Sequence, residues 1–248
     1  MTYPRHTLVF LGRAAREDLA EAVAAGVLPP FRRAPLPTWA AAAFADNDIP
    51  GIACRAEGDV PAGHVQLGVA FPFRHDGSRV RARITAPLAA VATTFTPYEV
   101  LAGPRPRTLA VGPALDALLD AAGRHGIALG VFGSTALQLA TRLAYLETSS
   151  DLDLVVKAPD EAALAGFAAA ASAIAERYAL RLDAEVDLAN GFGVKLAELL
   201  SGTRTVLGRG LADVRLLDRD EALRALGSGP CPATSRAPNP ALELQPGV

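Results

Sequence analysis

The first part of the chain has the hydrophobic pattern of short strands. Apolar residues alternate with polar ones, or run together for a few positions, between prolines and glycines; the segments of this kind are 7–11, 65–73 and 79–84. Asp76-Gly77 stands between the last two, and this dipeptide favours a hairpin turn. Residues 14–25 have helical spacing instead. The pattern predicts a small β-rich domain with a helix near its start.

The second strand of the predicted hairpin carries three arginines on one face. Arg79, Arg81 and Arg83 alternate with aliphatic residues, and a strand places alternate side chains on opposite faces. This face could be a solvated exterior or a surface that binds an anion. The pattern alone leaves both interpretations open.

After residue 108 the pattern alternates regularly between helical and strand periods. Residues 103–107 have the proline, glycine and arginine content of a linker. We expect domains at 1–108 and 109–226 and a disordered tail at 227–248, where periodicity is weak. In the second domain the pattern predicts helices at 113–124, 135–145, 160–178 and 220–226, strands at 127–132, 151–156, 180–188 and 214–217, and a strand or helix at 193–200. The expected fold class is α+β, with a β-rich N-terminal domain followed by an α/β domain with a mixed sheet.

Composition and charge restrict the classes of partner. The formal net charge is −2, so the chain does not have the basic composition of a protein that coats nucleic acid. The charge is unevenly distributed along the chain, because residues 1–108 hold 12 basic and 9 acidic side chains while the remainder has a net negative charge. Cys54 and Cys231 have no companions at disulfide or zinc spacing, which favours a reducing compartment. We find no leader peptide pattern and no apolar run long enough for a membrane span, and we expect a cytoplasmic protein.

Two short motifs carry the candidate chemistry. Gly133-Ser134 stands between a strand and a helix, where backbone N–H groups and the helix dipole favour a phosphate group. After sixteen intervening residues, Asp151 and Asp153 alternate with leucines on a strand, so both carboxylates project from one face. Two carboxylates beside a phosphate site suit Mg²⁺, which is usually shared between carboxylates and substrate phosphates. The pair predicts phosphoryl or nucleotidyl transfer.

A third carboxylate is expected on the neighbouring strand. Asp183, Glu185 and Asp187 share one face of the strand at 180–188, and any of them could complete a metal site or accept a proton. Asp187 lies near a turn, so Asp183 and Glu185 are the stronger candidates. Lys157 follows the Asp-X-Asp strand and could contact a phosphate, although a solvated strand end is the more ordinary interpretation.

These motifs resemble the core of the nucleotidyltransferase superfamily, and one branch of it most closely. Gly-Ser-X-Ala-X-Gln at 133–138, Thr-X-Leu-X-Tyr-Leu at 141–146 and Ser-Asp-Leu-Asp-Leu at 150–154 are similar to the pattern of the phosphoribosyl-dephospho-CoA transferases, the holo-acyl-carrier-protein synthases of malonate decarboxylase. Arg142 replaces a glycine of that pattern, and Asp183-Ala-Glu185 resembles the family's Asp-Gly-Glu strand. The second domain is thus expected to be nucleotidyltransferase-like.

The resemblance implies a reaction and a role for each residue. The prosthetic group of 2′-(5″-triphosphoribosyl)-3′-dephospho-CoA would be joined to a serine of an apo acyl carrier protein, with release of diphosphate. Gly133 and Ser134 would hold the outer phosphates. The residues with assigned roles are Asp151, Asp153 and Asp183 for Mg²⁺, Glu185 as a further catalytic acid or base, and Arg79, Arg81 and Lys157 for substrate.

Two other functions remain open at this point. The chain could transfer a nucleoside monophosphate from a nucleoside triphosphate to a protein or small molecule. It could also be a non-catalytic module that binds the carrier protein, although an adjacent pair of like charges is a costly feature for a domain without catalysis.

Overall fold

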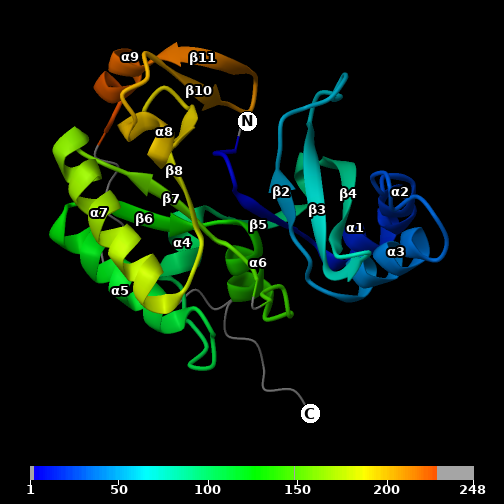
Figure 1. The fold of residues 1–248 in the computed structure, drawn as a ribbon. Coiled ribbons are helices and arrows are strands. Elements are labelled where there is room, and N and C mark those ends of the chain that lie inside the picture. Colours follow the sequence, from blue (N-terminus) through cyan, green and yellow to red (C-terminus); the bar gives the residue numbers. More distant parts are fainter. Residues whose placement is uncertain (1–2, 148, 228–248) are drawn as a thin grey trace. The chain divides into compact units, whose positions relative to one another are not determined.

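The computed structural model describes residues 3–147 and 149–227, so the expected tail lies, apart from Gly227, outside the described residues, as does Cys231. Two compact units make up the chain: Met1–Thr96 with Thr141–Tyr145, and Pro97–Ala140 with Leu146–Val248. Each unit contains one β-sheet and its own helices (Figure 1). This confirms the α+β fold class that the hydrophobic pattern predicts.

The first unit is built on a five-stranded antiparallel sheet of order β4-β3-β2-β1-β5. Its strands are β1 (Leu8–Leu11), β2 (Gly51–Ala53), β3 (His64–His75), β4 (Ser78–Pro87) and β5 (Val91–Phe95). The helices α1 (Arg13–Asp18), α2 (Ala20–Ala25) and α3 (Leu36–Asp46) pack with one face of this sheet around a common apolar core. A short 3₁₀ turn at Leu88–Ala90 precedes β5.

The β3–β4 hairpin has the turn and the alternation that its sequence predicts. Asp76 and Gly77 both have positive φ, 49° and 72°, as a two-residue type I′ turn requires. Along β4 the aliphatic residues Val80, Ala82 and Ile84 are buried in the core while the arginines between them lie on the other face. The predicted arginine face therefore exists, on the outer side of the first unit's sheet.

The second unit is built on a six-stranded mixed sheet of order β11-β10-β9-β8-β7-β6. Its strands are β6 (Ala128–Val131), β7 (Leu152–Lys157), β8 (Leu182–Asp187), β9 (Gly193–Lys195), β10 (Thr205–Arg209) and β11 (Val214–Asp218). The β7–β8 pair is parallel and the other pairs are antiparallel. The long helix α7 connects β7 to β8, as a parallel pair requires.

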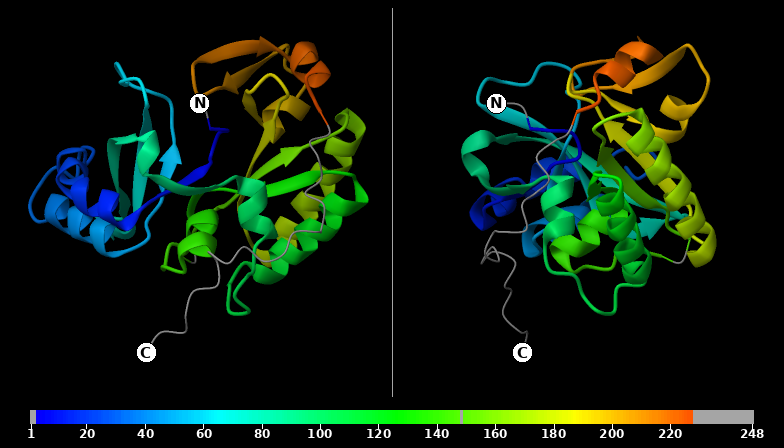
Figure 2. Two further views of the ribbon diagram at one scale, coloured as in Figure 1. Left: turned by 180° about the vertical axis from the view of Figure 1, so that it is seen from behind. Right: turned by 90° about the vertical axis from the view of Figure 1, so that its left-hand side faces the viewer.

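The helices of the second unit are α4 (Pro97–Ala102), α5 (Gly112–Arg124), α6 (Gly133–Thr141), α7 (Glu161–Tyr178), α8 (Leu196–Leu200) and α9 (Arg219–Arg224). Helices α5 and α7 lie together on one face of the sheet (Figures 1 and 2). Helix α4 packs on β6, where Gly130 lies against the backbone of Pro97. Among the described residues, no helix has the length and apolar character needed to cross a membrane.

The structure divides the chain between Thr96 and Pro97, whereas the linker composition suggests a boundary near residue 108. The difference arises because α4 contacts β6 and therefore belongs to the second unit. The predicted helix at 14–25 is broken at Leu19 into α1 and α2, and residues 193–200 form first a strand and then a helix. Helices α3 and α4 and the strands β2, β5 and β10 are not anticipated from the sequence pattern.

One segment between α6 and β7 belongs to the first unit. Helix α6 ends at Thr141, followed by Arg142 with a positive φ of 63°, and Thr141–Tyr145 then packs with the β3–β4 hairpin. Tyr145 is completely buried and its hydroxyl donates to the carbonyl of Ala70 at 2.9 Å. Burial raises the pKa of this phenol, so it remains a donor.

Arg79 holds this segment from the hairpin side. Its guanidinium donates to the carbonyl oxygens of Tyr145 at 2.5 Å and Phe71 at 2.9 Å, and lies 5.0 Å from the centroid of the Tyr145 ring. Leu143 packs against the apolar core of the unit. Arg79, a predicted substrate contact, therefore has a structural role in the first unit.

Replacement of Tyr145 by phenylalanine removes only the buried hydroxyl and leaves the Ala70 carbonyl without its donor. We expect the free energy of unfolding to fall by about 1–3 kcal/mol, the usual cost of a buried polar group that loses its partner. Urea denaturation measures the change, and the matched control is Tyr178→Phe, because that ring lies at the end of α7 and is only partly buried. Equal stability of the two variants would contradict the role given to the Tyr145 hydroxyl.

Candidate active site

The turn at the start of α6 is built directly against a carboxylate of β7. Gly133 has a positive φ of 61°, and a Cβ placed on it would overlap Asp153 Oδ2 and lie 2.8 Å from Asp153 Cγ. The N–H of Phe132 donates to the backbone carbonyl of Asp153 at 3.1 Å. Only glycine meets both requirements, the left-handed backbone and the close approach. The two motifs that the sequence singles out are therefore in contact.

The carboxylates of β7 and β8 share one face of the sheet. Leu152 and Leu154 are buried on the opposite face, so Asp153 projects from the side that faces away from them. In the parallel register, Asp153 is paired with Asp183, and Val155 with Glu185. The structure thus brings Asp153 and Asp183 to neighbouring positions, as the alternation along the two strands predicts.

The environment of Asp153 disfavours its charged form. Burial, followed by the charges of Asp183 and Asp151, raises the pKa of Asp153 to about 6. Glu185 acts in the same direction, and Lys195 opposes the increase. A carboxylate with this environment is stabilised in its charged form by a nearby cation. The site therefore has an electrostatic demand for additional positive charge.

Two basic residues that the motif analysis does not select lie among these acids. Lys195 Nζ, on β9, donates to Asp183 and lies 3.2 Å from Glu185 Oε1, while Arg181 Nε lies 2.6 Å from Asp151 Oδ1. Burial alone would lower the pKa of Lys195, but its hydrogen bonds and charge interactions with the two acids raise it. The lysine is therefore a fixed positive charge.

The donor set is compatible with a magnesium ion held in part by the substrate. In the part of the chain that the structure describes, no three His, Cys, Asp or Glu side chains form a closed metal cage. Mg²⁺ is commonly held by one or two carboxylates, with waters and substrate phosphates completing its coordination. Asp151 and Asp153 beside the Gly133 turn fit that pattern, and Asp183, the expected third ligand, pairs with Lys195.

The far ends of the same strands hold a separate polar cluster. The hydroxyl of Tyr98 donates to Asp187 at 2.9 Å, and Lys157 Nζ lies 5.0 Å from the centroid of the Tyr98 ring. Asp187 and Lys157 are each four residues beyond Asp183 and Asp153, about 13 Å along a strand. The structure does not bring Lys157 to the Gly-Ser turn.

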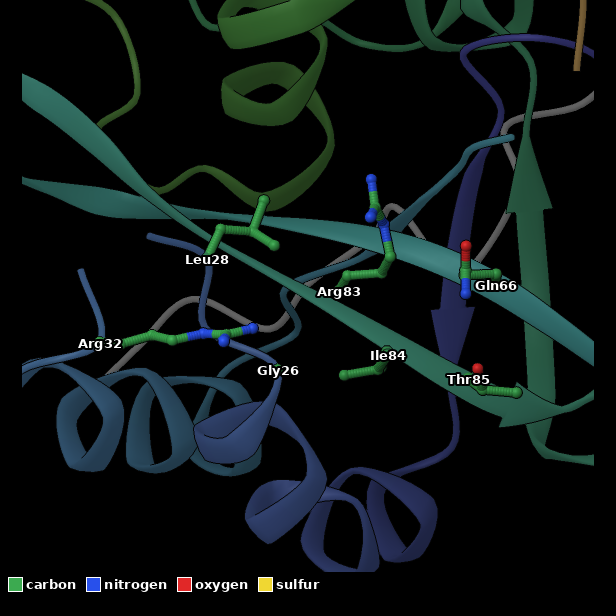
Figure 3. Close-up of a pocket in the computed structure, with 7 residues that line it drawn as sticks. All are labelled: Gly26, Leu28, Arg32, Gln66, Arg83, Ile84 and Thr85. Carbon is green, nitrogen blue, oxygen red and sulfur yellow. The ribbon is translucent and has the colours of Figure 1, made fainter. Parts of the chain in front are cut away.

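In the first unit, a hollow of about 240 Å³ lies where residues 26–32 meet the β3–β4 hairpin (Figure 3). Its lining residues are Gly26, Leu28, Arg32, Gln66, Arg83, Ile84 and Thr85. Arg83 forms an ion pair with Glu57, and Arg32 donates to the Val27 carbonyl at 2.7 Å. Arg81 is exposed on the same strand. The arginine face thus has one exposed guanidinium, that of Arg81, and borders the hollow through Arg83.

Two family models match the chain over most of its length. The model described as the phosphoribosyl-dephospho-CoA transferase MdcG N-terminal domain matches residues 4–97, and the corresponding C-terminal domain model matches residues 100–220. No solved structure matches.

Curated proteins with the name phosphoribosyl-dephospho-CoA transferase are similar to the chain. Those of Xanthomonas axonopodis pv. citri and Xanthomonas euvesicatoria pv. vesicatoria are each 32% identical over 218 residues, which is 87% of this chain and 94% of each relative. That of Bradyrhizobium diazoefficiens is 36% identical over 109 residues, 44% of this chain and 48% of the relative.

Replacement of Gly133 by alanine tests the contact with Asp153. The left-handed backbone costs an L-residue roughly 1–2 kcal/mol, and the added methyl must displace the carboxylate, so we expect at least that loss in the free energy of unfolding. The matched control is Gly123→Ala in α5, where a Cβ has open space and the change should stabilise the protein by about 0.5–1 kcal/mol. Chemical denaturation compares the two, and a neutral Gly133→Ala would contradict the arrangement.

Replacement of Asp153 by asparagine should stabilise the metal-free protein at pH 7.5. A carboxyl whose folded pKa is about 6, against about 4 in an unfolded chain, loses stability as pH rises through that interval. With allowance for its partial exposure, we expect a gain of about 1–2 kcal/mol that declines below pH 6 and disappears near pH 4. Urea denaturation in EDTA measures it, with exposed Asp120→Asn as control; a gain that does not depend on pH would exclude this cause.

Proposed function

The chain belongs to the phosphoribosyl-dephospho-CoA transferase family, a family of transferases, and we propose that it attaches the prosthetic group of malonate decarboxylase to its apo acyl carrier protein. The donor in this proposal is 2′-(5″-triphosphoribosyl)-3′-dephospho-CoA. The observation that supports it is the Gly133 turn packed against Asp153, which joins a phosphate-binding element to an acidic strand in one place.

The proposed reaction is one displacement at phosphorus. The hydroxyl oxygen of a carrier-protein serine bonds to the phosphorus nearest the ribose, the bond from that phosphorus to the bridging oxygen breaks, and diphosphate leaves. The product is a phosphodiester, and the serine proton passes to a base. Such reactions depend mainly on positioning and on electrostatic stabilisation of the phosphoryl oxygens.

The residues of the second unit have distinct parts in this proposal. Backbone N–H groups at Gly133 and Ser134 would hold the outer phosphates. Asp151 and Asp153 would hold Mg²⁺, which supplies positive charge to the triphosphate. Of the two predicted acids on β8, Asp183 is the better candidate for the base, because its side chain is 41% exposed and that of Glu185 only 6%.

The first unit offers a surface for the donor or the carrier protein. Arg79 is engaged with the Tyr145 segment, so contacts with phosphates or carboxylates are better assigned to Arg81 and to the arginines of the hollow in Figure 3. Guanidinium groups bind phosphate and carboxylate groups through bidentate hydrogen bonds. Arg32 is the stronger of the hollow's two arginines, because Arg83 already pairs with Glu57.

Replacement of Asp153 or Asp151 by asparagine should reduce the transfer rate at least about 100-fold, the usual scale for loss of a major electrostatic contribution. Asp120→Asn, an exposed change on α5, is the matched control and should retain the wild-type rate. The measurement is the mass increase of purified apo carrier protein with the triphosphoribosyl donor and Mg²⁺. EDTA should abolish the increase in the wild-type protein.

The same assay distinguishes the other functions. Parallel reactions contain labelled ATP or CTP in place of the donor. Labelling from these nucleotides without transfer from the dephospho-CoA derivative would identify a nucleotidyltransferase, and binding of the carrier protein without any transfer would identify a non-catalytic module. Wild-type rates in both aspartate variants would disprove the roles given to these carboxylates.

A further inference from the structure

Strand β8 presents two carboxylates to a single ammonium group. Lys195 Nζ contacts Asp183 and lies 3.2 Å from Glu185, and its side chain is 30% exposed. The lysine is not a chance neighbour from a loop, because the antiparallel register of β8 and β9 pairs it with Glu185. Its place in the acidic cluster is therefore set by the sheet.

The burial of Glu185 makes this ammonium necessary. Its side chain is 6% exposed, and an ionised carboxylate at that depth is costly unless it has a partner of opposite charge. Lys195 is the counter-charge of both Glu185 and the more exposed Asp183. Arg181 serves Asp151 at the other side of the cluster, and the Asp153 carboxylate lies against Gly133 between them.

We propose that Lys195 supplies, as a fixed ammonium, the positive charge that a second divalent cation would otherwise supply to Asp183 and Glu185, so that the site holds one metal ion at Asp151 and Asp153. This inference rests on the proposed metal-dependent transfer. It makes Lys195 a positioning residue, which keeps the two acids of β8 in place and keeps a second ion out.

The number of Mn²⁺ ions bound per chain tests the inference directly. Mn²⁺ is titrated into the full-length protein, and the free ion is followed by electron paramagnetic resonance. We expect one bound ion in the wild-type protein. In Lys195→Met the buried carboxylate loses its counter-charge while its oxygen ligands remain, and the number of bound ions should increase from one to two.

Three further variants provide the controls. Lys195→Arg keeps the charge and should bind one ion. Lys157→Met removes the chain's only other lysine, at the far end of β7, and should also bind one. Lys195→Gln removes the charge but keeps a hydrogen-bond donor beside the buried carboxylate, so it tests the same question if Lys195→Met does not fold; two ions are expected.

The possible results separate the inference from the proposed function. Two ions in the wild-type protein, or one ion in folded Lys195→Met or Lys195→Gln, would overturn the inference, whereas normal carrier modification in the same wild-type preparation would leave the proposed function standing. No bound Mn²⁺ in any variant would overturn both the inference and the metal assignment. Failure of the transfer assay in a protein that binds one ion would count against the proposed function alone.

Discussion

The contact between Gly133 and the carboxylate of Asp153 is the constraint on which the candidate site depends. It fixes the start of α6 against β7, and it requires both a left-handed backbone and the absence of a side chain at one position. Because the start of a helix favours an anion, a phosphate bound at this turn would lie beside a carboxylate. Two like charges in such proximity need a cation, and the chemistry of the site follows from that requirement.

The charges around Asp153 show how the fold maintains this arrangement. The acids of β7 and β8 would repel one another, and the protein sets Arg181 against Asp151 and Lys195 against the acids of β8. The basic side chains come from the edges of the cluster, so the compensation is uneven. The pKa of Asp153 remains raised, to about 6. An unfavourable charge thus lies at the place where the proposed reaction would put a cation.

The sequence pattern predicts the features that depend on residues close together in the sequence. Alternation along β4, the Asp76-Gly77 turn and the shared face of the acids on β7 and β8 all follow from the two-residue period of a strand. The contact of the Gly-Ser turn with the Asp-X-Asp strand was suggested by motif order and is present in the fold.

The sequence pattern does not predict the features that depend on contacts between residues far apart in the sequence. Lys195 joins the acids only through the register of β9 on β8, and its own segment gave no sign of this. Helix α4 looks like the end of one domain until its packing on β6 assigns it to the other. The helix predicted to reach residue 145 ends at Thr141, because the next residues are held by the hairpin of the first unit through Arg79.

The Tyr145 segment has a consequence for how this family can diverge. The chain passes from one compact unit to the other at three places, after Thr96, after Ala140 and after Tyr145, so neither unit is a contiguous piece of sequence. A chimera of two relatives joined at residue 96 would combine the β3–β4 hairpin of one relative with the Thr141–Tyr145 segment of the other. Arg79 and Tyr145, whose side chains contact each other, must therefore be inherited together, although 66 positions separate them, whereas position 70 contributes only a backbone carbonyl.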